Sequence, residues 1–220
     1  FNNPKSFKTD TSFNYYYSEM PAERNDVNAV SLGVSGSAMM YHNYFKREEN
    51  NLFPFIAPYQ PYSYTPGTMP FYNTKSPLTE LAYWGTLFAN KQKEESNVKF
   101  NHTQNFTPAF NFNVLYQRFG GKGILNNEST DNRTFALTAN HLGKRYVAQG
   151  GYLYQKIGRT ENGGVSDLSM VLDTIIDPKT IPVALSNAQT TIKKNTLFIT
   201  HSYGVPFNIF GSKAERDSLG

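Results

Sequence analysis

A chain of 220 residues with no cysteine and a net charge of +4 excludes several classes of protein at once. Neither a disulfide framework nor a Cys-based metal or redox site is available to it, and its dispersed lysines and arginines do not form a nucleic-acid-binding stripe. It lacks a run of about 18 apolar residues, which excludes a transmembrane helix. The length suits one all-β domain or part of one.

The N-terminal part of the chain has three sections. Residues 1–26 show no sustained period and are interpreted as an irregular N-terminal arm, and the alternation in 27–44 predicts a strand. Six prolines stand among the aromatic rings of residues 45–77. Because proline cannot donate to a β ladder, we expect a loop packed with rings, or a plug, lid or docking surface.

A two-residue rhythm dominates the rest of the chain. From Phe110 to Gln117, Phe, Val and Tyr side chains alternate with Asn and Gln, interrupted only by Leu115. Only a strand with one apolar and one polar face has this pattern. The strands predicted from it are 78–90, 97–105, 109–118, 133–142, 146–157 and 195–203, with a further one starting in 206–210.

The predicted strands and connections fit a membrane barrel. Ten residues at about 3.3 Å each, tilted by about 45°, cover roughly 23 Å, which is close to the apolar band of an outer-membrane barrel. The connections 105–108, 143–145 and 204–206 are tight, whereas 119–132 and 158–195 are long, and this asymmetry is typical of such barrels. We therefore expect an all-β, antiparallel transmembrane barrel spanning 27–210, with a truncated polar end at 211–220.

The rhythm assigns side chains to the two faces. The residues predicted to face lipid are Phe110, Phe112, Val114, Phe135 and Leu137. Those predicted to face the lumen are Lys99, Asn111, Asn113, Gln117, Thr138 and Asn140. Rings near strand ends predict aromatic girdles at the membrane surface, although cross-strand pairs in a soluble sheet are the alternative. The predicted girdle residues are Tyr116, Phe119, Tyr146, Tyr152, Tyr154 and Tyr203.

Charged candidates for the lumen are few. Lys99, Arg118 and Arg133 are the three considered, and the parity of Lys99 favours an inward direction. Cations that line a pore bias which ions pass. A salt-bridged interior network is the competing interpretation.

No chemistry of a catalytic site is evident. The four histidines are far apart and have no partner at metal-ligand spacing, so no metal and no cofactor are predicted. His141 and His201 precede tight turns and are expected at the membrane surface. No hydrolase, phosphate-binding or metalloprotease motif occurs. A pair of glycosidase carboxylates is defined by the distance between them, which the sequence does not give. We expect that the chain is not an enzyme.

Several segments resemble the putative porins of Bacteroidota. Residues 71–86 (FYNTKSPLTELAYWGT) and 89–95 (ANKQKEE) are similar to that family's YNTKSPYTEL signature, and so are 116–123 (YQRFGGKG), 131–135 (DNRTF) and 159–164 (RTENGG). The resemblance implies an outer-membrane barrel of a Gram-negative bacterium that acts as a passive diffusion pore. Members of the family are longer, so these residues would be its front portion, about seven or eight strands of a larger barrel.

Three functions remain open at this point. The leading one is a porin-like barrel that passes small polar solutes, with lipid and possible outer-membrane proteins as partners and no nucleic acid. The others are a structural or docking subunit of an outer-membrane assembly and a soluble β-sandwich that binds carbohydrate. The first predicts that Phe112→Arg blocks membrane assembly while Asn113→Arg does not.

Overall fold

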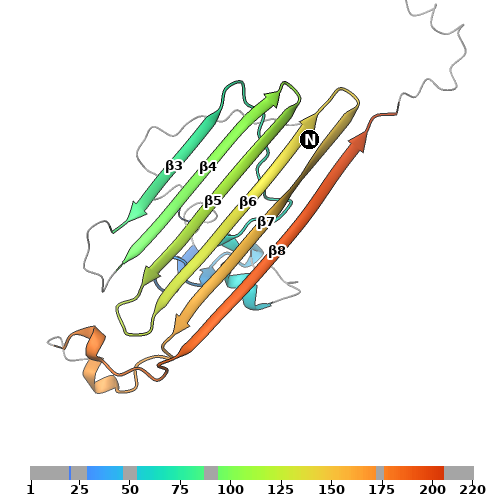
Figure 1. Cartoon of the computed structure of the whole chain (residues 1–220). Helices are drawn as coiled ribbons and strands as arrows, with labels where there is room; N and C mark the ends of the chain where they lie inside the picture. Colours follow the sequence, from blue (N-terminus) through green and yellow to red (C-terminus); the bar gives the residue numbers. More distant parts are fainter. Residues whose placement is uncertain (1–19, 21–28, 47–53, 87–93, 172–175, 206–220) are drawn as a thin grey trace, which may run out of the picture.

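The computed structural model describes residues 20, 29–46, 54–86, 94–171 and 176–205, and these form one large sheet with a smaller layer against it (Figure 1). The predicted arm, 1–26, and the polar end, 211–220, lie outside the described residues except for Met20. The strands of the large sheet are β3 (Leu78–Gly85), β4 (Glu95–Thr107), β5 (Phe110–Lys122), β6 (Ser129–Leu142), β7 (Tyr146–Glu161) and β8 (Ala188–Tyr203).

The large sheet is an antiparallel meander. Its strands follow the chain in the order β3-β4-β5-β6-β7-β8, so each strand pairs with its neighbour in sequence. Tight turns join β4 to β5 and β6 to β7 at one end, and longer connections gather at the other (Figure 1). The predicted all-β, antiparallel class is confirmed. The sheet fits a portion of a barrel, and within the described residues its edge strands β3 and β8 do not pair with each other.

Several strands extend further toward the long connections than their rhythm predicts. Gly120 and Gly121, expected in a loop, pair with Asp131 and Thr130. At the same end of the sheet, β8 begins at Ala188 rather than at residue 195, and Ala188 pairs with Glu161. The prediction ended too early because glycines and polar residues interrupt the apolar rhythm, although they do not interrupt the backbone ladder. The sheet therefore reaches beyond its apolar part at this end.

The single strand predicted for 27–44 is wrong. Its described part is a hairpin of β1 (Ala29–Ser31) and β2 (Met39–Tyr41), paired antiparallel. Gly36 lies in the turn with φ of 86°, where a Cβ would approach the carbonyl oxygen of Phe119 to 2.9 Å. A residue with a side chain fits this turn poorly, and so the chain reverses where the alternation suggested continuity.

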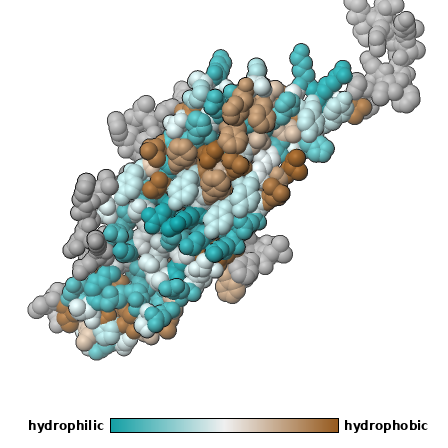
Figure 2. Space-filling model, in the orientation of Figure 1, coloured by the Kyte–Doolittle hydropathy of each residue, from teal (hydrophilic) through white to brown (hydrophobic). Residues whose placement is uncertain are grey.

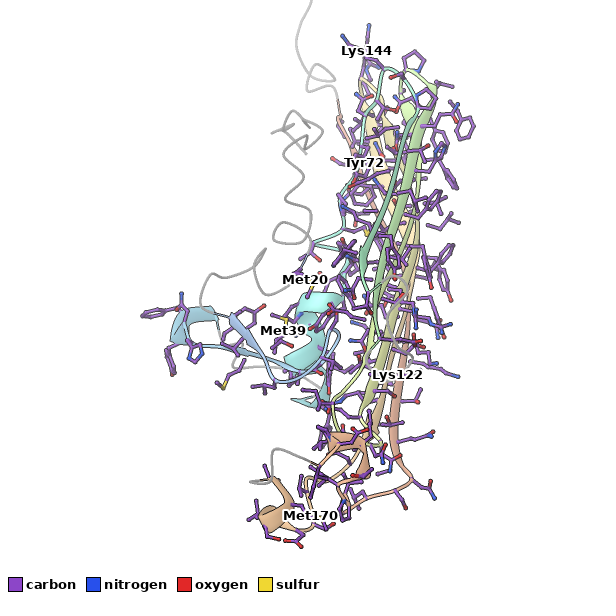
Figure 3. The ribbon with its side chains drawn as sticks, turned by 90° about the vertical axis from the view of Figure 1, so that its left-hand side faces the viewer. Met20, Met39, Tyr72, Lys122, Lys144 and Met170 are labelled. Atoms are coloured by element: carbon purple, nitrogen blue, oxygen red, sulfur yellow. The ribbon has the colours of Figure 1, made fainter. Side chains whose placement is uncertain are left out.

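The proline-containing segment is irregular, as its prolines require. It contains the short 3₁₀ helices η1 (Tyr44–Lys46) and η2 (Pro54–Tyr62), the second with Pro58 and Pro61 inside it. The hairpin and η2 lie against one face of the large sheet, where Figure 3 labels Met20 and Met39. Among the described residues, none forms such a layer on the opposite face (Figure 3). We call residues 29–46 and 54–76 the covering segment, the sheet face beneath them the covered face, and the opposite face the bare face.

The connection between β7 and β8 projects past the long-loop end of the sheet, where Figure 3 labels Met170. It contains η3 (Leu168–Val171) and η4 (Pro178–Thr180). Lys179 links the β7–β8 connection to the β5–β6 connection, because its Nζ donates hydrogen bonds to the carbonyl oxygens of Gly123 and Leu125 at 2.7 and 2.8 Å. None of the helices in the described part of the chain is long and apolar enough to cross a membrane.

Candidate functional site

The polar residues of the rhythm share the covered face. Asn113 lies opposite Thr138, Asn111 opposite Asn140, and Gln117 opposite Lys99. Most of them are nearly inaccessible: Asn111 and Asn113 are each 1% exposed. The residues predicted to face a lumen are therefore brought together, but the covering segment lies over them.

Side chains of the covered face donate hydrogen bonds to backbone carbonyls of the covering segment. Gln155 Nε2 donates to the carbonyl oxygen of Tyr64 at 2.6 Å, and Asn140 Nδ2 donates to that of Tyr72 at 3.2 Å. Asn132 Nδ2 donates to the carbonyl oxygen of Gly36 at 2.6 Å. Buried carbonyls need partners, and an irregular segment has no ladder to supply them. The amides and hydroxyls of the sheet satisfy the covering segment as a neighbouring strand would.

Side-chain to side-chain bonds hold both ends of the covering segment. Ser35 Oγ donates to Asn97 Oδ1 at 2.7 Å, and Asn105 Nδ2 donates to Asn73 Oδ1 at 2.7 Å. These contacts join residues that lie 62 and 32 positions apart in sequence. The covering segment is consequently docked in one defined position along the strands.

Two apolar clusters anchor the covering segment. In the first, Tyr62 packs edge-on against Phe119, with ring centroids 5.2 Å apart, and Trp84 packs against the same ring. In the second, Met69 sits on Leu115, Ala136 and Leu153. Leu115, which interrupts the polar rhythm, is thus a packing site for the covering segment. The prediction that Phe119 belongs to an aromatic girdle is wrong, because its side chain is 1% exposed on the covered face and packs beneath the covering segment.

Lys99 forms an ion pair on the covered face. Its Nζ lies 3.2 Å from Glu80 Oε1 on β3, and both side chains are largely buried. The structure thus favours the interior salt-bridge interpretation over an isolated cation that lines a pore. The hypothesis that Arg118 and Arg133 face the lumen is wrong. They lie on the bare face, as their shared parity with Phe112 and Phe135 requires.

Some polar atoms beneath the covering segment have no protein partner in the structure. Both amide atoms of Asn113, the Thr138 hydroxyl and the Gln117 amide nitrogen are buried without a hydrogen bond. Buried groups of this kind are ordinarily satisfied, most often by water where protein partners are missing. The contact between sheet and covering segment therefore has a polar strip at Asn113 and Thr138 next to the apolar cluster at Leu115.

The covering segment contacts β8 through Phe71, whose ring packs edge-on against Phe198, but it leaves polar positions of this strand open. Thr190, Lys194 and Thr200 have the covered-face parity, and all three are exposed. Their character remains that of the covered face, with hydroxyls and an ammonium group. The described sheet thus offers accessible polar side chains on this edge strand, interrupted by the half-buried Ile192 and Phe198.

The bare face has the opposite character. Along β5 and β6 it presents the residues predicted to face lipid, with Phe110 and Leu137 each 37% exposed and Phe112, Val114 and Phe135 half-buried. On β8 it presents Leu197 and Ile199, which are 84% and 75% exposed. Figure 2 shows apolar side chains gathered over the half of this face nearer the tight turns.

The tyrosines predicted as girdles fall at three levels of the bare face. Tyr146 pairs with Tyr203 at the tight-turn end and packs between the rings of His141 and His201. Tyr116, Phe135 and Tyr154 are successive cross-strand neighbours near the long-loop end. Tyr152 instead lies between these levels, opposite Leu137 and Leu197, and its hydroxyl donates to Asn195 Oδ1 at 2.7 Å.

A row of cations follows directly beyond the Tyr116 level. Arg118, Arg133, Lys156 and Lys193 occupy successive register positions on β5, β6, β7 and β8. Sequence reasoning missed this row because it depends on the pairing register of four strands. The only available signal was the parity that these four residues share with the rings of their own strands.

The described residues contain no group of three or more His, Asp or Glu side chains that could hold a metal ion. Across the described sheet, the bare face carries the cation row, and the covered face carries the Lys99–Glu80 and Arg159–Glu161 ion pairs. The two faces of the sheet therefore differ in charge as well as in polarity.

The comparisons with known proteins give one family. A family model described as "Putative porin" matches residues 1–219. Neither the search of curated proteins nor the search of solved structures gave a match.

Proposed function

The chain belongs to the putative porin family, and from this premise we propose that its sheet forms part of the wall of an outer-membrane barrel through which small polar solutes diffuse passively. The wall separates lipid on the bare face from water on the covered face. Neither a catalytic step nor a cofactor is part of this function.

The observation that supports this proposal most strongly is the difference in polarity between the two faces of the same strands. On the bare face, from the Tyr146–Tyr203 pair to the Lys156–Lys193 pair, the side chains are apolar, aromatic or uncharged apart from histidine. These two levels are ten residues apart along β7, which is about 33 Å of strand and about 23 Å of depth at a tilt of 45°. An outer-membrane barrel presents an apolar band of about 25 Å. The agreement supports a lipid-facing role for the bare face.

The covered face supports a wet interior partly filled by the covering segment. Its amides and hydroxyls are costly in contact with lipid but suited to contact with water or with a plug. The covering segment occupies the face over β4 to β7 and contacts Phe198 of β8. It leaves Thr190, Lys194 and Thr200 of β8 open. Solutes would be sieved by the width left beside this plug and by the charge of the wall.

The test is the conductance of the purified full-length protein in planar lipid bilayers. Discrete current steps that scale with salt concentration are the expected result. Their absence at high protein load, with the protein shown to be inserted, would refute passive diffusion.

A second function is favoured by one observation. The covering segment is anchored by two ring-containing clusters and several hydrogen bonds, which suits a permanently filled barrel that serves as a structural or docking subunit. This function predicts inserted protein without conductance and stable co-purification with another outer-membrane protein. A two-sheet carbohydrate-binding sandwich has less support, because the layer against the described sheet is irregular chain and a hairpin of two three-residue strands rather than a second large sheet.

A further inference from the structure

The cation row on the bare face has a composition that the wall function does not require. Arg118 pairs with Arg133, Arg133 with Lys156, and Lys156 with Lys193, so four cations face outward side by side. Like charges directly opposite in an antiparallel sheet are destabilising. A row of four is expected only where a counter-charge is supplied.

The sheet supplies part of that counter-charge through one carboxylate. Asp131 Oδ1 accepts from Arg118 Nε at 2.9 Å, its Oδ2 lies 2.9 Å from an Arg133 guanidinium nitrogen, and the same oxygen is 3.7 Å from Lys156 Nζ. Lys193 makes no ion pair with any residue that the structure describes. Four positive charges against one negative charge leave an excess of +3 on this strip of the surface.

We infer that this row is a binding site for a phosphate-bearing membrane lipid whose headgroup sits on Arg118, Arg133, Lys156 and Lys193. The inference rests on the proposed function, because it takes the bare face to lie in the membrane. Arginine matches phosphate through two parallel N–H donors, and lysine adds a point charge.

The level of the row on the strands points to a lipid rather than to a soluble anion. The row lies two residues, about 7 Å, beyond the Tyr116–Phe135–Tyr154 level. Tyrosine rings prefer the headgroup level of a membrane, where the ring is apolar and the hydroxyl is wet. Cations one step further out lie at the level of lipid phosphates.

An apolar groove on the same face provides a second, independent observation. It measures about 540 Å³ and lies where Ala139 and Gly150 leave a hollow between the larger Phe112 and Ile199. Along β6 its lining begins at Leu137, four residues or roughly 13 Å from Arg133, on the side toward the tight turns. A lipid bound by its phosphate at the row extends its acyl chains in this direction. An acidic protein surface would engage the row and gain nothing from the groove.

The experiment compares two double variants of the full-length protein in neutral detergent. A fluorescent phosphatidic acid is the probe, phosphatidylcholine is the zwitterionic control lipid, and anisotropy reports binding. R133Q/K193Q removes two cations of the row, whereas K144Q/R145Q removes two exposed cations at the tight-turn end of the same strands. The expected result is at least a tenfold weaker affinity for the first variant and no change for the second, since each bond between charged groups contributes about tenfold.

Two further variants keep the inference falsifiable if R133Q/K193Q folds poorly. K193Q changes an exposed side chain without an ion pair to any described residue, and it should weaken binding without loss of secondary structure. D131N removes the carboxylate that competes with phosphate for the two guanidinium groups, and it should tighten binding. Weaker binding by D131N in a folded protein would overturn the inference.

Other outcomes are equally decisive. An equal loss of affinity in the two double variants would contradict a local site, and displacement of the probe by inorganic phosphate at the probe's own concentration would replace the lipid with a free anion. If R133Q/K193Q lost a co-purifying protein while its lipid affinity stayed unchanged, the row would be a protein-binding surface. Conductance measured on the same preparation separates the two proposals, because lipid binding without current steps refutes only the pore.

Discussion

Replacing Phe112 by arginine tests the assignment of the bare face to lipid. Phe112 lies six residues along β5 from Arg118, about 20 Å of strand and about 14 Å of depth at a tilt of 45°. If the cation row marks one surface of an apolar band of about 25 Å, this position is close to the midplane. Arginine at the midplane of an outer-membrane barrel costs about 2–4 kcal/mol, falling to about 0–1 kcal/mol near the surface.

The matched control is Gln189→Arg. Gln189 is exposed on the bare face of β8 and lies beyond the cation row, opposite Thr160. The free energy of unfolding is measured by denaturant titration of the full-length protein refolded in lipid bilayers. We expect Phe112→Arg to lose at least 2 kcal/mol more than Gln189→Arg. Equal losses in the two variants would refute the placement of the bare face in lipid.

Three further predictions concern the covering segment. Because the chain has no cysteine, a disulfide between cysteines replacing Ser35 and Asn97 is selective. It should leave the conductance unchanged, because solutes are proposed to pass beside the segment, and a reversible loss of conductance on oxidation would contradict a stationary plug. Leu115→Ala should lower the free energy of unfolding by about 2–5 kcal/mol and speed proteolysis of residues 54–72, and equal proteolysis rates would contradict the anchor. Burial raises the pKa of Tyr62 to about 12, so the contribution of this side chain to stability is complete below pH 10 and is lost as the pH rises through 12. Tyr62→Phe should remove this loss of stability at alkaline pH, and a loss of equal size in that variant would assign it to other groups.

The expectation for Asn113→Arg changes with the structure. The rhythm alone predicts that the side chain faces water and that the variant assembles normally. Asn113 is instead buried beneath the covering segment, where an unpaired guanidinium is costly. Arginine at this position should displace the segment without preventing insertion, so proteolysis of residues 54–72 should accelerate while assembly in bilayers is retained.

The sequence was sufficient to predict the six strands of the large sheet and their two faces, although not the full length of each strand. Alternation is a local property, so the opposite directions of Phe112 and Asn113 follow from the two-residue period without any knowledge of partners. Their neighbours on adjacent strands follow only from the register. This is why the cation row was missed, whereas the parity of Arg118 and Arg133 with Phe112 and Phe135 was enough to place these two on the bare face.

The layer against the sheet was beyond the reach of sequence patterns. Leu115 and Phe119 break the polar rhythm at the two places where the covering segment carries Met69 and Tyr62. Such interruptions are uninformative until the partner segment, some 45 residues earlier or more, is known to lie there. The hairpin at Gly36 was likewise hidden, because Val30, Leu32 and Val34 alternate as a strand would.

The most direct test of the central claim is the accessibility of β8 in lipid vesicles. Two exposed residues of β8 lie on the bare face, Leu197 and Ile199, and two lie on the covered face, Lys194 and Thr200. Each of the four is replaced in turn by a single cysteine. With a spin label attached in the full-length protein, we expect the first pair to be relaxed by lipid-dissolved oxygen and the second pair by a water-soluble nickel complex. Equal access of the nickel complex to all four positions would contradict the division of this wall between lipid and water.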